Sequence, residues 1–280
     1  MNSPNRAAWE TIQFLERAFA HLTPIAQRRA RRRLSKADSR NVDALPYELL
    51  VFEVCRRFGL RPEFEPSSGE QTPDLRLFVA NQPYFADVFL TNRPAKTLIN
   101  FQGFDGYEDS GEAAKKIADT LAEKAARYRR LDAPLLLFVA SVGHDVGMHD
   151  LETALYGTTI GELSCAGGLR VDCHKDWHPH GLFCPPGRNA RHRHVSAVIG
   201  CDWFDSSART GRRLQCVVYH HWHPDVALPM HTFGQFQDVH FLANASGQFA
   251  PAVTGTPNLV MSTTSDPEVN WGPYSTDRPW

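Results

Sequence analysis

The sequence has no apolar stretch long enough to cross a membrane, and it has few cysteines for its length. A membrane-spanning helix needs about 20 consecutive apolar residues, and no part of the chain supplies them. The first residues also lack the charged-then-apolar pattern of a secretory signal. Six cysteines scattered over 280 residues are too sparse for a disulfide scaffold. These absences lead us to expect a cytoplasmic protein with no membrane partner.

The chain carries a net charge of -1, and this charge is unevenly distributed. Residues 1–42 contain nine Lys or Arg against three acidic residues, so the rest of the chain is negative. The densest basic run is Arg28-Arg29-Ala30-Arg31-Arg32-Arg33. Because clustered arginines can neutralise phosphates, we predict that Arg28, Arg29, Arg31, Arg32 and Arg33 contact nucleic acid. The other interpretation, a helix face exposed to water, stays open.

The spacing of apolar residues predicts the elements of the first half of the chain. At the start of the chain we expect a helix over 6–21, a short helix from Thr23-Pro24 that carries the arginine run, and a polar linker over 35–41. There follow a helix from Asp43 to Gly59 with Pro46 in its first turn, an extended segment over 61–65, and strands over 74–80 and 84–91 joined by a turn at 81–83. After a loop over 92–109 we expect a helix over 112–131, a strand over 134–141 and a helix over 148–156. The strand over 134–141 is apolar on both faces, which is typical of parallel strands. The pattern predicts a mixed α/β core.

The second half of the chain has weaker patterns. Strands are predicted over 195–204 and 214–221. The segment 157–192 is rich in Gly, His, Cys and Pro, and the chain beyond Pro224 is rich in Pro, Gly, Thr and Ser, so we expect loops in both. The predicted domains are a basic helical arm over 1–42, an α/β core over 43–157, and a β-containing, loop-rich extension over 158–280 that packs on the core.

Four charged residues of the core stand where the pattern expects apolar ones. Glu48 lies on the apolar stripe of its helix, and Lys124 lies on the apolar stripe of the helix over 112–131. Asp74 begins a strand. Asp87 interrupts an apolar strand, where an unpaired carboxylate is costly. Carboxylates from two strands of a hairpin can converge on one Mg²⁺ or Mn²⁺ ion. A nearby ammonium can then stabilise developing negative charge.

Each of these residues also has a purely structural interpretation. Asp74 could accept hydrogen bonds from local amides at a turn. Glu48 could pair with an arginine of the core, with Arg76 as the candidate. Lys124 could extend its ammonium out of the apolar stripe into water. Asp87 could serve structure alone, although its position inside an apolar strand argues against that.

The order of these residues resembles the PD-(D/E)XK, or restriction-endonuclease-like, nuclease superfamily. The matching residues are Pro73-Asp74 and, about a dozen residues later, Tyr84-Phe85-Ala86-Asp87-Val88, which follow a helix with an inward Glu48. The resemblance covers residues 43–141. It implies that Asp74 and Asp87 are ligands of Mg²⁺ or Mn²⁺, that Glu48 assists the metal or positions water, and that the core has the restriction-endonuclease-like order of helix, three strands, helix and strand.

Other segments resemble an uncharacterised bacterial branch of this superfamily. They are Lys124-Ala125-Ala126-Arg127-Tyr128, the strand over 134–140, and the segment from His223 to Pro229, which resembles "HNP-x-A-x-x-P". The sequence departs from the superfamily pattern at Phe89, where the superfamily has its lysine, and at Asp87, where glutamate is more frequent. Lys124-x-x-x-Tyr128 parallels the Gln-x-x-x-Tyr motif of RecB-type nucleases. The resemblance therefore implies that Lys124 replaces the missing lysine, with Tyr128 beside it.

Two function classes follow from this reading. The first is a Mg²⁺-dependent or Mn²⁺-dependent endo- or exonuclease that hydrolyses phosphodiester bonds of DNA or RNA. The second is a catalytically inactive protein of the same fold that binds nucleic acid or a protein partner, and Phe89 at the lysine position favours it. A homodimer is compatible with both.

The histidines and cysteines of the second half suggest a third class, a zinc-stabilised interaction protein. Cys173, His174, His178 and Cys184 fall close together. Zinc sites of proteins usually contain closely spaced Cys-x-x-Cys or His-x-x-x-His pairs. His174 and His178 have the second spacing, but no Cys-x-x-Cys pair accompanies them. We therefore expect a loop of partly exposed histidines and no zinc.

A basic segment precedes the strand over 195–204. We predict that Arg191 and Arg193 contact nucleic acid, and an exposed lead-in to the strand is the other interpretation. Trp203, Phe204 and Trp222 could stack on bases, although aromatic residues of strands more often belong to the core.

Overall fold

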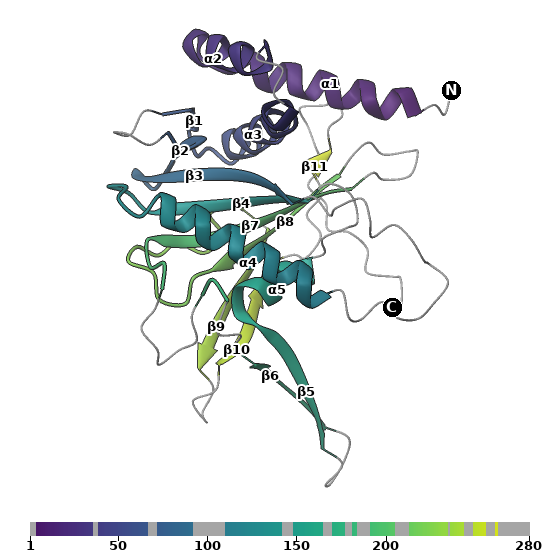
Figure 1. The fold of residues 1–280 in the computed structure, drawn as a ribbon, viewed down its shortest axis with the longest axis vertical. Helices are drawn as coiled ribbons and strands as arrows, with labels where there is room; N and C mark the ends of the chain where they lie inside the picture. Colours follow the sequence, from purple (N-terminus) through teal and green to yellow (C-terminus); the bar gives the residue numbers. More distant parts are fainter. Residues whose placement is uncertain are drawn as a thin grey trace.

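The computed structural model describes the chain except for residues 1–3, 36–38, 67–71, 92–109, 142–147, 165–169, 177–180, 184–190, 205–212, 235, 244–248, 256–260 and 263–280. Its helices are α1 (Pro4–Ala20), α2 (Pro24–Ser35), α3 (Ser39–Arg57), α4 (Ser110–Arg127) and α5 (Met148–Tyr156). Its strands are β1 (Glu63–Phe64), β2 (Leu75–Val79), β3 (Gln82–Thr91), β4 (Leu135–Ser141), β5 (Thr158–Ser164), β6 (Arg170–Asp176), β7 (Val195–Phe204), β8 (Arg213–His220), β9 (Gln237–Ala243), β10 (Phe249–Thr254) and β11 (Met261–Ser262). The described part of the chain is therefore a mixed α/β protein, as predicted (Figure 1).

One mixed sheet forms the centre of the molecule. Its strand order is β1-β2-β3-β4-β7-β8-β9-β10, with β11 paired to β8, while β5 and β6 form a separate hairpin. β4 lies between β3 and β7 and runs parallel to both. Every residue from Leu135 to Ala140 of β4 is buried. This confirms the prediction of a parallel strand covered on both faces.

Helices cover both faces of the sheet (Figure 1). Helices α1, α2 and α3 share an apolar core with one face, which includes Tyr84, Ala86 and Val88 of β3. Helices α4 and α5 share a second core with the other face, which includes Phe85 and Phe89. Because side chains alternate along a strand, residue 87 falls on the α4 face. The fold thus directs Asp87 toward α4.

The carboxyl end of α3 agrees with the prediction, but its start does not. Gly59 has a positive φ of 73°, and the amides of Gly59 and Leu60 donate to the carbonyls of Arg56 and Cys55. This pattern is a Schellman motif, in which glycine avoids steric strain. The helix starts at Ser39 within the predicted linker, so Pro46 lies inside it and not in its first turn. Proline removes one backbone hydrogen bond, and packing of the apolar face outweighs that loss.

The hairpin between β2 and β3 turns earlier than predicted. Ala80 and Asn81 form a two-residue turn with positive φ values of 48° and 70°. Val79 and Gln82 then pair directly, so Gln82 and Pro83 belong to β3. Two positive φ values match the right-handed twist of a hairpin, and asparagine tolerates this conformation better than most residues.

The expectation of loops over 157–192 and beyond Pro224 was wrong in part, because strands occupy stretches of both segments. β5 and β6 form a hairpin within 157–192, and β9, β10 and β11 follow Pro224. β7, β8, β9 and β10 also continue the sheet of the core. Their stability comes from pairing with the neighbouring strands, which local composition does not reveal.

None of the described helices combines the length and apolarity that crossing a membrane requires.

Candidate functional site

Asp87 is a buried carboxylate at the centre of β3. Its exposed fraction is 2%. The Lys124 ammonium lies 2.5 Å from Oδ2, and the Tyr128 hydroxyl donates to Oδ1 at 2.7 Å. Tyr128 directly follows α4 and lies one helical turn after Lys124, so the same side of the helix supplies both donors. A charge-assisted pair of this kind offsets the cost of burying the carboxylate.

Tyr128 is held as a neutral donor. Burial raises the pKa of its hydroxyl, and the negative charge of Asp87 and the hydrogen bond to Asp87 raise that pKa further. The hydroxyl therefore keeps its proton at neutral pH. Tyr128 thus fixes the orientation of the Asp87 carboxylate.

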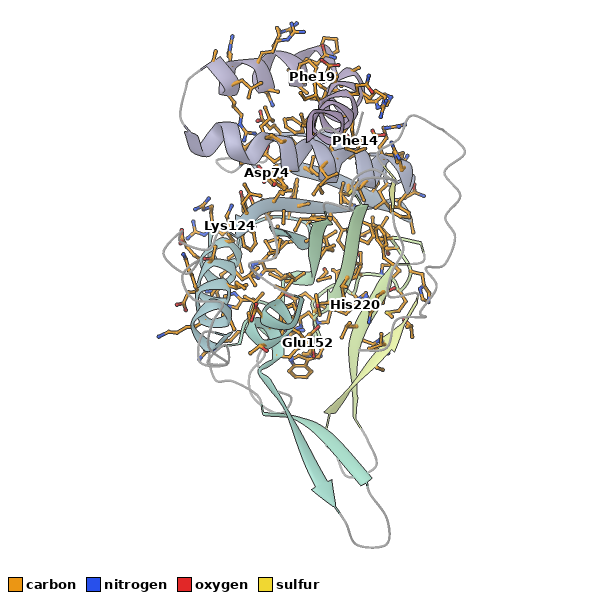
Figure 2. The ribbon with its side chains drawn as sticks, turned by 90° about the vertical axis from the view of Figure 1, so that its right-hand side faces the viewer. Phe14, Phe19, Asp74, Lys124, Glu152 and His220 are labelled. Carbon is orange, nitrogen blue, oxygen red and sulfur yellow. The ribbon has the colours of Figure 1, made fainter. Side chains whose placement is uncertain are left out.

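Asp74 lies beside Asp87 on the neighbouring strand. Leu75 pairs with Ala86 in the antiparallel register, which brings the residue before Leu75 next to the residue after Ala86. Oδ2 of Asp74 accepts a hydrogen bond of 2.7 Å from the amide of Val88. Asp74 therefore bonds the adjacent strand and not a local turn. Figure 2 shows Asp74 below the layer of α1–α3 and Lys124 on the adjacent α4.

The pKa of Asp74 lies well above its ordinary value. Burial is the largest cause, and the negative charges of Glu48 and Asp87 add to it. The Val88 amide and the Lys124 ammonium oppose the shift but do not cancel it. The fold therefore holds three carboxyl groups close enough to repel one another, with Lys124 as one compensating cation.

Glu48 is buried and engaged by an arginine of the arm. Nη1 and Nη2 of Arg33 donate to its two carboxylate oxygens at 2.5 and 2.6 Å, and Nη1 also reaches Glu65 at 2.8 Å. Burial raises the pKa of Glu48, the bonds to Arg33 lower it, and the charges of Glu65 and Asp87 raise it again. The suggestion that Arg76 pairs with Glu48 was wrong, because Arg76 pairs with Glu63.

Some arginines of the run in α2 therefore contact the rest of the protein, and others face solvent. Arg33 binds Glu48, Arg29 donates to the carbonyl of Glu65 at 2.7 Å, and the Arg31 guanidinium lies 5.4 Å from the centre of the Phe19 ring. The side chains of Arg28 and Arg32 are exposed. The structure thus leaves these two most open to a polyanion.

Lys124 does not extend its ammonium away into water. The side chain is 20% exposed, and its ammonium contacts Asp87. Phe89, where the resemblance leads us to expect a lysine, is buried with its ring centre 6.0 Å from the Lys124 ammonium. The ammonium from α4 and the ring from β3 thus share the space next to Asp87.

The donor set available to a metal is small. In the described part of the chain, no three His, Cys, Asp or Glu side chains form a ready-made set of metal ligands. Asp74 and Asp87 are a pair of oxygen donors with excess negative charge around them. Such a pair fits Mg²⁺, which keeps most of its water ligands. The side chains of Cys173, His174, His178 and Cys184, named above for zinc, lie outside the described ones.

The sequence contained a signal for the role of Arg33 that the composition of the run obscured. Ala26 and Ala30 are the buried residues of α2. Arg33 follows Ala30 by three positions, which places it on the same face of the helix. Helical spacing therefore separates Arg33 from the exposed Arg28 and Arg32.

The basic segment before β7 has an exposed Arg191 and an exposed Arg193, which pairs with Asp225 at 3.0 Å. Trp222 is partly exposed, and the side chains of Trp203 and Phe204 lie outside the described ones. No family model matches this chain, and neither the curated proteins nor the solved structures contain a match to it.

Proposed function

We propose that the protein is a Mg²⁺- or Mn²⁺-dependent nuclease with a restriction-endonuclease-like core. The observation that carries the proposal is the buried Asp87, which lies beside Asp74 and is held by Lys124 and Tyr128. The order α3, β1, β2, β3, α4, β4 supports it, because the superfamily has the order helix, three strands, helix and strand. Fold alone would not establish activity, so the proposal rests on the site.

The residues of the site divide the work by their chemistry. Asp74 and Asp87 would hold the metal, which when bound supplies Lewis-acid stabilisation of a phosphoryl oxygen. Lys124, at the rim of the carboxylate pair, would stabilise negative charge on the phosphate. Tyr128 would hold Asp87 in one orientation. Glu48, held by Arg33, would contribute to the negative potential at Asp74.

A cleavage assay tests the proposal. Supercoiled plasmid, single-stranded DNA and RNA are each incubated with protein and Mg²⁺, Mn²⁺ or EDTA. We expect cleavage that EDTA abolishes and that Asp87→Asn and Asp74→Asn reduce to the background of the assay. Asp119→Asn is the matched control, because Asp119 is an exposed carboxylate of α4. Cleavage that survives Asp87→Asn would place the activity elsewhere.

A second candidate function is a catalytically inactive protein of this fold that binds nucleic acid or a protein partner. The observation that favours it is the closed ionic network: both oxygens of Asp87 and both oxygens of Glu48 already have donors. Calorimetric titration separates the two functions. The enzyme binds Mg²⁺ or Mn²⁺ through Asp74 and Asp87, whereas the inactive protein releases no heat of metal binding.

A further inference from the structure

Three segments of the chain meet at the carboxyl end of α4. His194 bonds the carbonyl of Ala125 in α4 at 2.8 Å. The segment 191–194 is bonded in turn to the segment 221–225: the amide of Asp225 donates to the carbonyl of Arg193 at 2.7 Å. The side chains of these two residues also form an ion pair. Hydrogen bonds therefore hold the backbone of these three segments together, and the surface that they form does not depend on a single loop.

Positive charge accumulates where these segments meet. Arg129, just beyond α4, and Arg191 have exposed side chains, and within the described residues neither forms an ion pair. Both lie close enough to His192 for their charges to lower its pKa, after the larger effects of burial and of His194. Asp225, bound to Arg193, is the acidic side chain paired there. The local surplus of arginines calls for an anionic ligand.

Aromatic rings lie next to these arginines. The Trp222 and His223 rings are nearly parallel, with an interplanar angle of 26° and ring centres 5.3 Å apart. Trp222 is partly exposed and His223 is exposed. His221 fixes the preceding backbone, because its Nε2 bonds the carbonyl of Arg191 at 3.0 Å and its Nδ1 accepts the amide of His223 at 2.9 Å. The rings are thus held in position before any ligand arrives.

We propose that this surface, which we call the basic platform and define as Arg129, Arg191, Arg193, Trp222 and His223, binds single-stranded nucleic acid. Arginine guanidinium groups would hold the phosphates. A Trp or His face can stack on a base only when that base is not stacked within a duplex. Trp222 also packs against the apolar core on the α4 side, which leaves His223 as the exposed ring. The combination of arginines with the exposed His223 ring and the partly exposed Trp222 ring therefore favours a single strand.

The position of the platform connects it to the candidate site. Arg129 follows Tyr128, whose hydroxyl bonds Asp87. A strand bound along the platform would thus begin at the end of the helix that carries Lys124. The inference names the substrate class of the proposed nuclease, and in that respect it rests on the proposed function, but the binding itself requires no metal.

Fluorescence anisotropy in EDTA tests the platform without cleavage. The full chain is titrated into a labelled single strand and into a duplex of the same sequence. We expect tighter binding to the single strand. Arg129→Ala/Arg191→Ala should weaken it and reduce the slope of log K against log salt by about 1.4, since each phosphate contact to a single strand contributes about 0.7. His223→Ala should weaken single-strand binding about fivefold or more and leave duplex binding unchanged.

The matched control is Lys115→Ala/Lys116→Ala. It removes the same charge from exposed positions of the same helix, about 20 Å from Arg129 along its axis. Circular dichroism verifies that each variant is folded. The proposal is overturned if the control weakens binding as much as the platform variant, if the platform variant binds normally, or if the duplex binds as tightly as the single strand.

The outcome is separable from that of the nuclease proposal. If cleavage depends on metal but the platform variants bind normally, the proposed site at Asp87 is retained and the proposed platform is rejected. Platform-dependent binding without cleavage keeps the platform and supports the inactive alternative.

Discussion

Lys124 lies one helical turn before Tyr128, and the two side chains donate to opposite oxygens of one buried carboxylate, that of Asp87. This relationship links β3 to α4 through a polar contact inside an otherwise apolar interface. It is also what a site needs in order to hold a carboxylate in one orientation. The same three residues can therefore contribute both to stability and to activity, and mutagenesis can distinguish the two contributions.

Removing one donor should leave the Asp87 charge poorly compensated. We expect Lys124→Met to lower the free energy of unfolding by about 2–3 kcal/mol, toward the low end for broken buried pairs because Lys124 is partly exposed. Adding Asp87→Asn to Lys124→Met should recover part of the loss, since the uncompensated charge is then gone. Urea denaturation measures the wild type, Lys124→Met, Asp87→Asn and the double variant. Lys115→Met is the exposed control, and additive effects of the two changes would contradict the pairing.

The pair between Arg33 and Glu48 should fasten the arm to the core. We expect Arg33→Gln to cost about 2–3 kcal/mol of unfolding free energy, because the buried Glu48 loses its bidentate partner. Arg33→Gln/Glu48→Gln should cost less than the single change. Arg32→Gln, at an exposed neighbouring position, should stay within about 0.5 kcal/mol of wild type. Equal effects of Arg33→Gln and Arg32→Gln would show that the pair between Arg33 and Glu48 does not fasten the arm to the core.

The ionised side chain of Asp74 should destabilise the folded protein. Its pKa is raised by burial and by Glu48 and Asp87, so the folded state disfavours the ionised form and stability is lost as pH rises through the folded pKa. Asp74→Asn removes the charge and keeps an oxygen for the Val88 amide. We expect it to raise the free energy of unfolding at pH 7 by about 1–2 kcal/mol. Destabilisation by Asp74→Asn, measured beside Asp119→Asn, would argue that the charge is stabilising.

His221 should make stability fall in mild acid. Burial, the largest cause, lowers its pKa to about 4 in the folded protein, against an ordinary value of 6.5. Between these values the unfolded chain binds more protons, so stability declines as pH falls from 6.5 toward 4. The loss at pH 4.5 should reach about 2–3 kcal/mol. Thermal denaturation from pH 7 to 4.5 should show a smaller decline for His221→Gln, and an unchanged decline would refute the role of His221.

Patterns confined to one element were predictable from the sequence. The helix over 148–156 and the strand over 195–204 have the bounds that were predicted. Asp87 and Lys124 meet as expected because each interrupts the apolar face of its own element, and those faces must pack together. A charged residue within a regular apolar pattern thus predicted, from local sequence alone, a contact between two elements.

Strands with a weak hydrophobic pattern, and contacts between distant segments, were not predictable in the same way. β5 with β6, and β9 with β10, are held by register between strands of weak hydrophobic pattern. Arg33 reaches Glu48 because α2 docks on the core, and charge composition alone predicted that all five arginines would face a ligand. Local patterns state which face is buried, but they do not state what lies opposite it.

The most direct measurement of the central claim is Mn²⁺ binding by electron paramagnetic resonance, in which free Mn²⁺ gives the signal. If Asp74 and Asp87 hold the metal, the wild-type protein and Asp119→Asn should remove free Mn²⁺ to the same extent. Asp87→Asn and Asp74→Asn should leave the metal free. Equal Mn²⁺ binding by Asp87→Asn and wild type, or none by wild type, would contradict a metal site at Asp74 and Asp87.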